Sequence, residues 1–387
     1  MRTLSRTFTV FAFATSTLAA SAILLDAQAV SAQTAGVCDS VGIRIVENSS
    51  RLKAPVAFTL GAKPNVDMGG LEDDPDRELS PRNGYPRAIR LTDGRVVIAD
   101  VARVQFFDKD GKRLRLTGRK GGGPGEFGSV AALCRTRGDT VLASSGVPSR
   151  VTVLSQTGEY LSVTTPPAGH FSEREFCLND GTFLAVQMMP TERGSDGILR
   201  LNHVNRAGAV MHMIAEVNTG VFDMAVRRES QYITWGQNVA FGNAIDYEVR
   251  VFSANGKLLT IIRTDDKLEP ISRSELEKLP PTGARANATA AERADDARRI
   301  AASSHTKTWP PYDKLMTDFT GRLWIQDWKP SQTALEPIGW TAFDVNGKLI
   351  GRLIIPAPES KEKRQVVVSF GKDEVFIRRL DDDGAAH

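Results

Sequence analysis

Residues 93–127 read DGRVVIADVARVQFFDKDGKRLRLTGRKGGGPGEF, and this stretch decides the fold. The stretch contains two glycine-bearing turns, Asp93-Gly94 and Asp110-Gly111, and runs of apolar, β-branched and aromatic residues lie on both sides of each turn. Such runs between Gly-containing turns are typical of β-hairpins. Together with the strand that leads into Asp93, the stretch predicts two consecutive hairpins.

The same pair of turns recurs along the chain. Glycines of the second turn are separated by 47, 50, 48 and 91 residues; they are Gly111, Gly158, Gly208, Gly256 and Gly347. The earlier, inner turn recurs at Gly94, Gly138, Gly181, Gly236 and Gly321. A unit of roughly 45 residues with four strands is the signature of a β-propeller blade. The predicted blades are residues 84–128, 129–168, 169–218, 222–266 and 313–356.

The two ends of the chain carry the remaining strand-like segments. Residues 365–380 supply part of a sixth blade, and residues 56–60 supply the rest. Pairing first and last segments closes a ring and removes exposed sheet edges. The sequence therefore predicts an all-β, six-bladed propeller of four-stranded blades, closed by N- and C-terminal strands.

One blade resembles a known repeat. Residues 118–127, GRKGGGPGEF, resemble the loop that joins blades in NHL-repeat six-bladed propellers. Ile98-Ala99-Asp100, followed by residues 103–108, resembles the core of that repeat. The match is strong in blade one and fades to a plain pattern in blades two to five. The resemblance implies the fold and leaves the function open, because lyases, lactonases, sensors and adaptors share this architecture.

Composition and the N-terminus indicate an exported globular protein. The chain has 387 residues, 41% hydrophobic and 25% charged, with a formal charge of +3, so no basic excess favours nucleic acid. Arg2 and Arg6 precede an apolar stretch, residues 8–25, and VSA at 30–32 or AQA at 27–29 fits a cleavage site. We expect residues 1–32 to be a signal peptide and residues 33–387 to be periplasmic or secreted. A membrane anchor is the alternative, and no later run is long enough to span a bilayer.

Three cysteines, Cys38, Cys134 and Cys177, are too few for a disulfide scaffold. Cys134 and Cys177 occupy similar places in successive repeats, and export permits a bridge between them. We favour the alternative of two separately buried thiols, because free cysteine behaves as a small hydrophobe.

Residues 267–312 break the period and account for the doubled spacing of 91. Residues 272–279 and 288–303 are rich in helix-forming residues. The insert lies between the outer strand of blade four and the inner strand of blade five, and therefore emerges on the face where the channel opens. It is either a helical lid over the channel mouth or, as we favour, a solvated insert packed on one blade.

Catalytic motifs are absent from the sequence. The five histidines show no ligand spacing, and there is no HExxH, CxxC or GxSxG. Asp108 and Asp110 begin like a calcium loop, but no Glu stands at its twelfth position. His170 lies alone at a blade crossing, where a structural role is the more common one. No cofactor is identified, although a channel Ca²⁺ or Zn²⁺ stays an open alternative.

A pattern of charge accompanies the inner turns. The residues seven positions before the five inner-turn glycines, and before Gly371 in the C-terminal piece, are Arg87, Ala131, Arg174, Glu229, Lys314 and Arg364. Four are cationic and lie near the starts of inner strands, so their convergence favours an anionic ligand such as a carboxylate or phosphate. The alternative is that charges gather at strand ends because strand ends are wet. The candidate ligand-binding residues are Arg87, Arg174, Lys314 and Arg364, with Arg119, Lys120, His170, Trp309 and Trp328.

These observations favour a non-catalytic recognition module. We expect a monomer whose channel-mouth face binds a small, anionic ligand or a protein partner, with no nucleic acid. The main alternative is a metal-dependent lactonase or lyase that uses the central channel. A sensory domain is a third hypothesis, but we expect no membrane segment after the propeller that could carry a signal.

Overall fold

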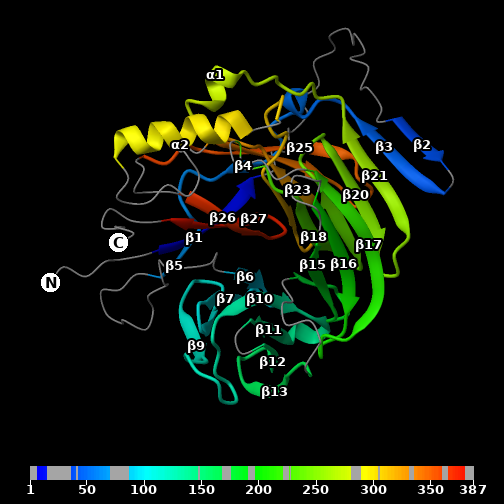
Figure 1. Ribbon diagram of the computed structural model, residues 1–387. Helices are drawn as coiled ribbons and strands as arrows, with labels where there is room; N and C mark the ends of the chain where they lie inside the picture. The colour runs from blue at the N-terminus through cyan, green and yellow to red at the C-terminus, as the bar shows by residue number, and fades with distance from the viewer. Residues whose placement is uncertain are drawn as a thin grey trace, which may run out of the picture.

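The computed structural model describes residues 7–14, 36–40, 42–69, 87–146, 149–167, 176–190, 197–220, 226, 228–279, 289–303, 306–330, 335–359 and 365–379. Strands dominate these residues, and their sheets follow one another around a central axis, which Figure 1 views nearly end on. Each innermost strand contacts the innermost strand of the next sheet, and the last contacts the first, so the ring is closed. The fold is an all-β propeller.

Five blades each hold four consecutive strands in antiparallel order. Blade one comprises β6 (Arg87–Arg90), β7 (Val96–Asp100), β8 (Arg103–Phe107) and β9 (Arg113–Thr117). Blade two comprises β10 (Val130–Arg135), β11 (Val141–Ser145), β12 (Arg150–Leu154) and β13 (Tyr160–Thr164). Blade three comprises β14 (Phe176–Cys177), β15 (Phe183–Met189), β16 (Gly197–Val204) and β17 (Val210–Gly220).

Blade four comprises β18 (Gln231–Trp235), β19 (Asn238–Gly242), β20 (Glu248–Ser253) and β21 (Leu258–Thr264). Blade five comprises β22 (Lys314–Thr317), β23 (Leu323–Gln326), β24 (Ile338–Phe343) and β25 (Leu349–Ile355). The turns between these strands lie where the glycine repeat predicts them. Their glycines adopt positive φ, for example Gly111 at 85° and Gly256 at 90°, where any other residue would be strained.

The prediction of six four-stranded blades is wrong, because the structure has five. The sheet that completes the ring contains β26 (Gln365–Phe370), β27 (Glu374–Arg379) and β1 (Thr7–Ala14), with β4 (Thr59–Leu60) and β5 (Val66–Gly69) paired to β1. β1 comes from the segment expected to be a signal peptide. The edge of β27 needs a hydrogen-bonding partner, and the eight residues of β1 supply a longer ladder than the two of β4.

The N-terminal segment also covers the outer edge of blade four. β3 (Ile43–Asn48) pairs in parallel with β21, and β2 (Gly36–Ser40) pairs with β3. Asn48 Nδ2 donates to Gly347 O at 3.0 Å, and the amide of Leu349 donates to Asn48 Oδ1 at 2.8 Å. The buried amide of Asn48 therefore joins the covered edge of blade four to blade five.

The hydrophobic core lies between neighbouring blades. Trp324 and Trp340 are 0% and 1% exposed. Their rings lie 4.3 Å and 5.0 Å from the ring of Phe370, which comes from the closing sheet. These aromatic contacts fasten blade five to the closing sheet.

The inner strands of blades two and three are joined covalently. Cys134 on β10 and Cys177 on β14 form a disulfide, with their Cα atoms 6.0 Å apart. The preference for two separate buried thiols is therefore corrected. Equivalent positions on neighbouring inner strands approach within the Cα separation that a disulfide requires.

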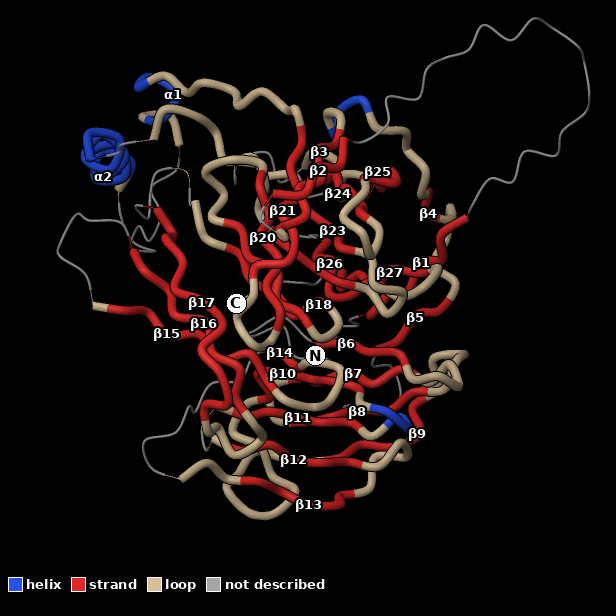
Figure 2. Tube along the Cα trace, turned by 90° about the vertical axis from the view of Figure 1, so that its right-hand side faces the viewer, coloured by secondary structure: helices blue, strands red, loops and turns tan. Residues whose placement is uncertain are grey.

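The insert between blades four and five contains two α-helices within its described part. They are α1 (Arg273–Leu276) and α2 (Ala290–Ser303). Ser272 begins α1 with a capping box, in which its side chain and that of Glu275 each accept a backbone N–H of the other residue. Figure 2, turned by 90°, shows both helices on one face of the ring. None of the helices in the described residues is long and apolar enough to cross a membrane.

Candidate ligand-binding channel

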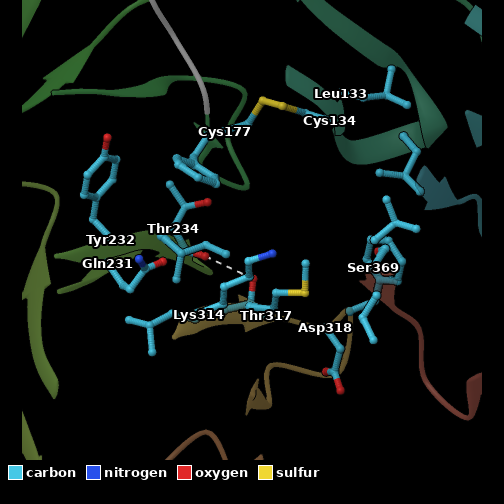
Figure 3. A pocket seen from close by; sticks show the side chains of 18 of the residues that line it. Leu133, Cys134, Cys177, Gln231, Tyr232, Thr234, Lys314, Thr317, Asp318 and Ser369 are labelled. Carbon is cyan, nitrogen blue, oxygen red and sulfur yellow. Dashed lines mark hydrogen bonds between the residues drawn. A yellow bond between two sulfur atoms is a disulfide. The ribbon is translucent and has the colours of Figure 1, made fainter. Parts of the chain in front are cut away.

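The inner strands of all six sheets enclose a central channel of about 1250 Å³. Its wall is contributed by β6, β10, β14, β18, β22 and β26, and Figure 3 shows side chains from several of these strands directed around one open space. A separate cavity of about 170 Å³ lies between blade five and the closing sheet and shares Lys314 and Val367 with the channel. The channel is thus much larger than this neighbouring cavity.

An apolar belt surrounds the middle of the channel. It consists of Ile89, Leu133, Phe176, Ile233, Leu315, Met316, Val367 and Val368. Phe176 meets Tyr232 edge-on at 6.0 Å across the junction of blades three and four. The disulfide lies in the same wall, since both of its cysteines line the channel. The belt offers apolar contact to any molecule that lies along the axis.

A few polar side chains interrupt the apolar belt. Thr317 Oγ1 donates to Thr234 O at 3.1 Å, which ties β22 to β18 (Figure 3). The side chains of Asn179, Gln231 and Ser369 make no hydrogen bond within the described part of the chain, and all three line the channel. They are available to a bound molecule.

At one end, Arg135 and Phe319 meet across the axis. Arg135 ends β10 of blade two, and Phe319 lies in the β22–β23 turn of blade five, on the opposite side of the ring. The guanidinium carbon lies 4.8 Å from the centre of the Phe319 ring. We call this end, formed by Arg135, Asp139, Asn179, Asp318 and Phe319, the channel floor.

The two carboxylates of the channel floor are engaged locally. Asp139 accepts from the amide of Thr92 at 3.0 Å and from the Thr92 hydroxyl. Asp318 accepts from Arg322 Nε, and from Trp324 Nε1 at 2.9 Å. Both side chains therefore hold turns and neighbouring blades together.

A second contact positions Arg135. Its Nη1 donates to the carbonyl of Arg90 at 3.2 Å, and Arg90 in turn forms an ion pair with Glu374 at 2.6 Å. Burial raises the pKa of the Glu374 carboxyl, and the charge of Arg90 partly offsets this. The ion pair joins blade one to the closing sheet and so fixes the carbonyl that receives Arg135.

At the other end, the helical insert borders the channel. Val226, Ile271, Leu276, Leu279 and Ala301 form one apolar cluster, against which Trp309 and Trp328 pack. The two indoles stack at 5.0 Å, and Trp328 Nε1 donates to Val226 O at 3.0 Å. Leu279, Val226 and Trp328 also line the channel. The insert therefore adjoins the channel mouth, which we define by these three residues with Lys329 and Pro330.

The structure brings together only part of the candidate residue set. Lys314 is the first residue of β22 and lines the channel. Trp328 also lines the channel, and Trp309 stacks on Trp328. Glu229, the acidic member of the six-residue pattern, lines the same channel and is exposed. A purely cationic ring is thus not formed by the lining residues that the structure describes.

The remaining candidates lie elsewhere or outside the described residues. Arg87 begins β6, and its side chain lies outside the described part of the structure. Arg119 and Lys120 lie in the loop between β9 and β10; neither is among the channel-lining residues, and Arg119 Nε donates to Glu126 Oε1 at 2.8 Å. Arg174, Arg364 and His170 lie outside the described residues.

Within the described part of the chain, no group of three or more His, Cys, Asp or Glu side chains could hold a metal ion. The described histidines His203 and His212 stack on each other at 6.0 Å in blade three, on its β16 and β17 strands. Sequence reasoning missed Arg135, Asn179 and Phe319, which lie at or just after the ends of inner strands rather than at their starts. The only signal for them was their position beside the repeated inner turn.

Comparisons with known proteins give no family. No family model matches the chain, and no curated protein matches it. Among solved structures, it is similar to a protein of Bacteroides fragilis described as exported, with 12% identity, TM-score 0.44 and coverage of 71% of each chain. It is also similar to an inactive virginiamycin B lyase of Staphylococcus aureus with quinupristin, with 10% identity, TM-score 0.34 and coverage of 84% of this chain and 90% of that one. A third similar structure is a calcium-binding regucalcin of Agrobacterium tumefaciens, with 11% identity, TM-score 0.31 and coverage of 72% of this chain and 77% of that one. Likenesses of this size carry no functional argument.

Proposed function

We propose that this chain is an exported recognition protein that binds a small molecule in its central channel without catalysing a reaction. The observation that carries the proposal is the channel itself, about 1250 Å³ of space with an apolar belt and a few unengaged polar side chains. Sites for small ligands typically measure roughly 300–1,000 Å³ and combine apolar walls with a few polar groups. The channel has room for such a ligand and some water.

Export is supported by the Cys134–Cys177 disulfide, because disulfides persist mainly in oxidising compartments. We further propose that cleavage after residue 32 removes β1 and that β4 and β5 then pair with β27. The closing sheet of the mature ring would then be shared between the two ends of the chain, and we propose that the blades are of the NHL type. Removal of an exposed sheet edge favours this pairing.

The proposal is tested with N-phenyl-1-naphthylamine, a neutral dye whose fluorescence rises in apolar surroundings. We expect the purified exported protein to bind one dye per chain. Gln231→Trp and Met316→Trp place an indole in the channel and should weaken binding by about tenfold or more, which corresponds to about 1.4 kcal/mol.

Met213→Trp is the matched control, because Met213 is 54% exposed on β17, outside the channel. This variant should bind the dye as the unmodified protein does. Equal binding by all three variants, or no binding by the unmodified protein, would contradict a ligand site in the channel.

A further inference from the structure

We propose that the channel floor is an anion subsite, with Arg135 as its cation, and that the ligand is a small amphipathic anion. This inference rests on the proposed function, because it assigns the chemistry of a molecule held in the same channel. The anionic group would lie against Arg135, and the apolar body would lie along the belt above it. This site is at the opposite end from the cationic strand starts that the sequence singled out.

The geometry of Arg135 leaves hydrogen-bond donors free. Its side chain is 25% exposed, and Nη1 is committed to the carbonyl of Arg90. Nε and Nη2 donate to no group in the described residues. The guanidinium carbon lies over the Phe319 ring, and this cation–π contact uses the charge of Arg135 rather than its N–H groups. The contact with Phe319 therefore helps to hold Arg135 without consuming the donors that bind an anion.

The charge of Arg135 is only partly compensated. The nearest carboxylate oxygen, Asp139 Oδ1, lies 3.8 Å from Nη1, which is too long for a hydrogen bond. Asp139 is held by Thr92, and Asp318 is held by Arg322 and Trp324. A cation in a partly enclosed site, away from bulk water, attracts an anion more strongly than the same cation on an open surface.

The surroundings of the channel floor select an amphipathic anion over a small inorganic one. Directly above lie Leu133 and Phe176 of the apolar belt, which a hydrated phosphate or sulfate would not contact favourably. The free amide of Asn179 lines the same end and offers a further donor. A carboxylate or sulfonate attached to an aliphatic or aromatic body satisfies both parts of the site.

The test compares two dyes with the same ring system. N-phenyl-1-naphthylamine is neutral, and 1-anilinonaphthalene-8-sulfonate carries an added sulfonate. We expect the unmodified protein to prefer the sulfonate. Arg135→Met keeps an apolar stem against Phe319 but removes the charge. It should weaken sulfonate binding by about tenfold to a hundredfold, the range for a hydrogen bond to a charged group, and leave the neutral dye within about twofold.

Two further variants and one competition sharpen the comparison. Arg135→Lys keeps the charge without the planar fork and should be intermediate for the sulfonate. Arg115→Met is the matched control, since Arg115 is 45% exposed on β9 and outside the channel. If circular dichroism shows that Arg135→Met does not fold, a competition experiment on the unmodified protein takes the place of this variant. Decanoate, but not decanol, should then displace the sulfonate dye.

The outcomes separate the two proposals. Equal affinity of the unmodified protein for both dyes, or an equal loss of both in Arg135→Met, would overturn the anion subsite and leave the channel function standing. Displacement of the sulfonate by decanol as readily as by decanoate would overturn the anion subsite in the same way. Failure of the unmodified protein to bind either dye would instead refute the channel function.

Discussion

Reduction of the Cys134–Cys177 disulfide should destabilise the protein by an amount set by the loop that it closes. The two cysteines are 43 residues apart in sequence. In the chain-entropy treatment, releasing a loop of that length restores roughly 13 cal/mol/K to the unfolded chain, or about 4 kcal/mol at 25 °C. The bond joins inner strands of neighbouring blades, so the loop contains β11, β12 and β13 of blade two.

The expected shift in melting temperature is small because the chain is long. Unfolding entropy near the melting temperature is roughly 2.1 cal/mol/K per residue, which over 387 residues gives about 0.8 kcal/mol/K. A loss of about 4 kcal/mol then lowers the melting temperature by about 5 °C. Differential scanning calorimetry with and without dithiothreitol measures this shift.

Variants identify the bond responsible for the shift. Cys134→Ser and Cys177→Ser should each melt at the temperature of the reduced protein, and dithiothreitol should have no further effect on either. Cys38→Ser is the control and should keep the full sensitivity to reduction. Thiol titration in denaturant should give one thiol before reduction and three after it. Three titratable thiols in freshly purified protein would refute the bond, and a reductant-insensitive melt would refute its structural role.

Two further predictions concern buried charge. The pKa of His203 is lowered by burial and by the neighbouring charge of His212, against the opposite effect of Asp180, so the unfolded chain takes up a proton at higher pH than the folded one. The contribution of His203 to stability should therefore be complete above about pH 6.5 and decrease as the pH falls below that value. Urea titrations should show a weaker dependence of the unfolding free energy on pH in His203→Gln. An unchanged pH dependence in this variant would contradict a lowered pKa of His203. Asp327 accepts from both Arg51 and Arg352, and the three side chains are 14%, 14% and 11% exposed. Asp327→Asn should cost roughly 3–5 kcal/mol in guanidinium unfolding, and Glu159→Gln, at an exposed ion pair, should change little; equal effects would show that burial of the network is unimportant.

The repeating part of the fold could be predicted from the sequence because its determinants are local. Each blade needs hairpin turns at a fixed spacing, and a glycine such as Gly111 or Gly256 reports a backbone with positive φ directly. The observed strands of the five blades lie inside the predicted blade limits, except that β17 ends at Gly220, two residues beyond its limit.

The closing sheet could not be predicted in the same way, because it depends on competition between distant segments. Residues 7–14 and 59–60 both suit a strand, and nothing local states which one pairs with β27. The disulfide presented a similar problem. Cys134 and Cys177 occupy equivalent repeat positions, but only the distance between β10 and β14 decides whether their sulfurs meet.

The channel floor shows why a site in a propeller is harder to predict than its blades. Counting back from each inner turn finds positions that are equivalent in every blade, and it found Lys314. Arg135 and Phe319 are not equivalent positions; they meet because blades two and five lie on opposite sides of a closed ring. Analysis of the sequence repeat finds what the blades have in common, whereas a molecule on the axis contacts residues from all the inner strands at once. The residues that distinguish one propeller's ligand from another's are therefore expected among the departures from the repeat, and Arg135, held by Arg90 beside the disulfide, is such a departure.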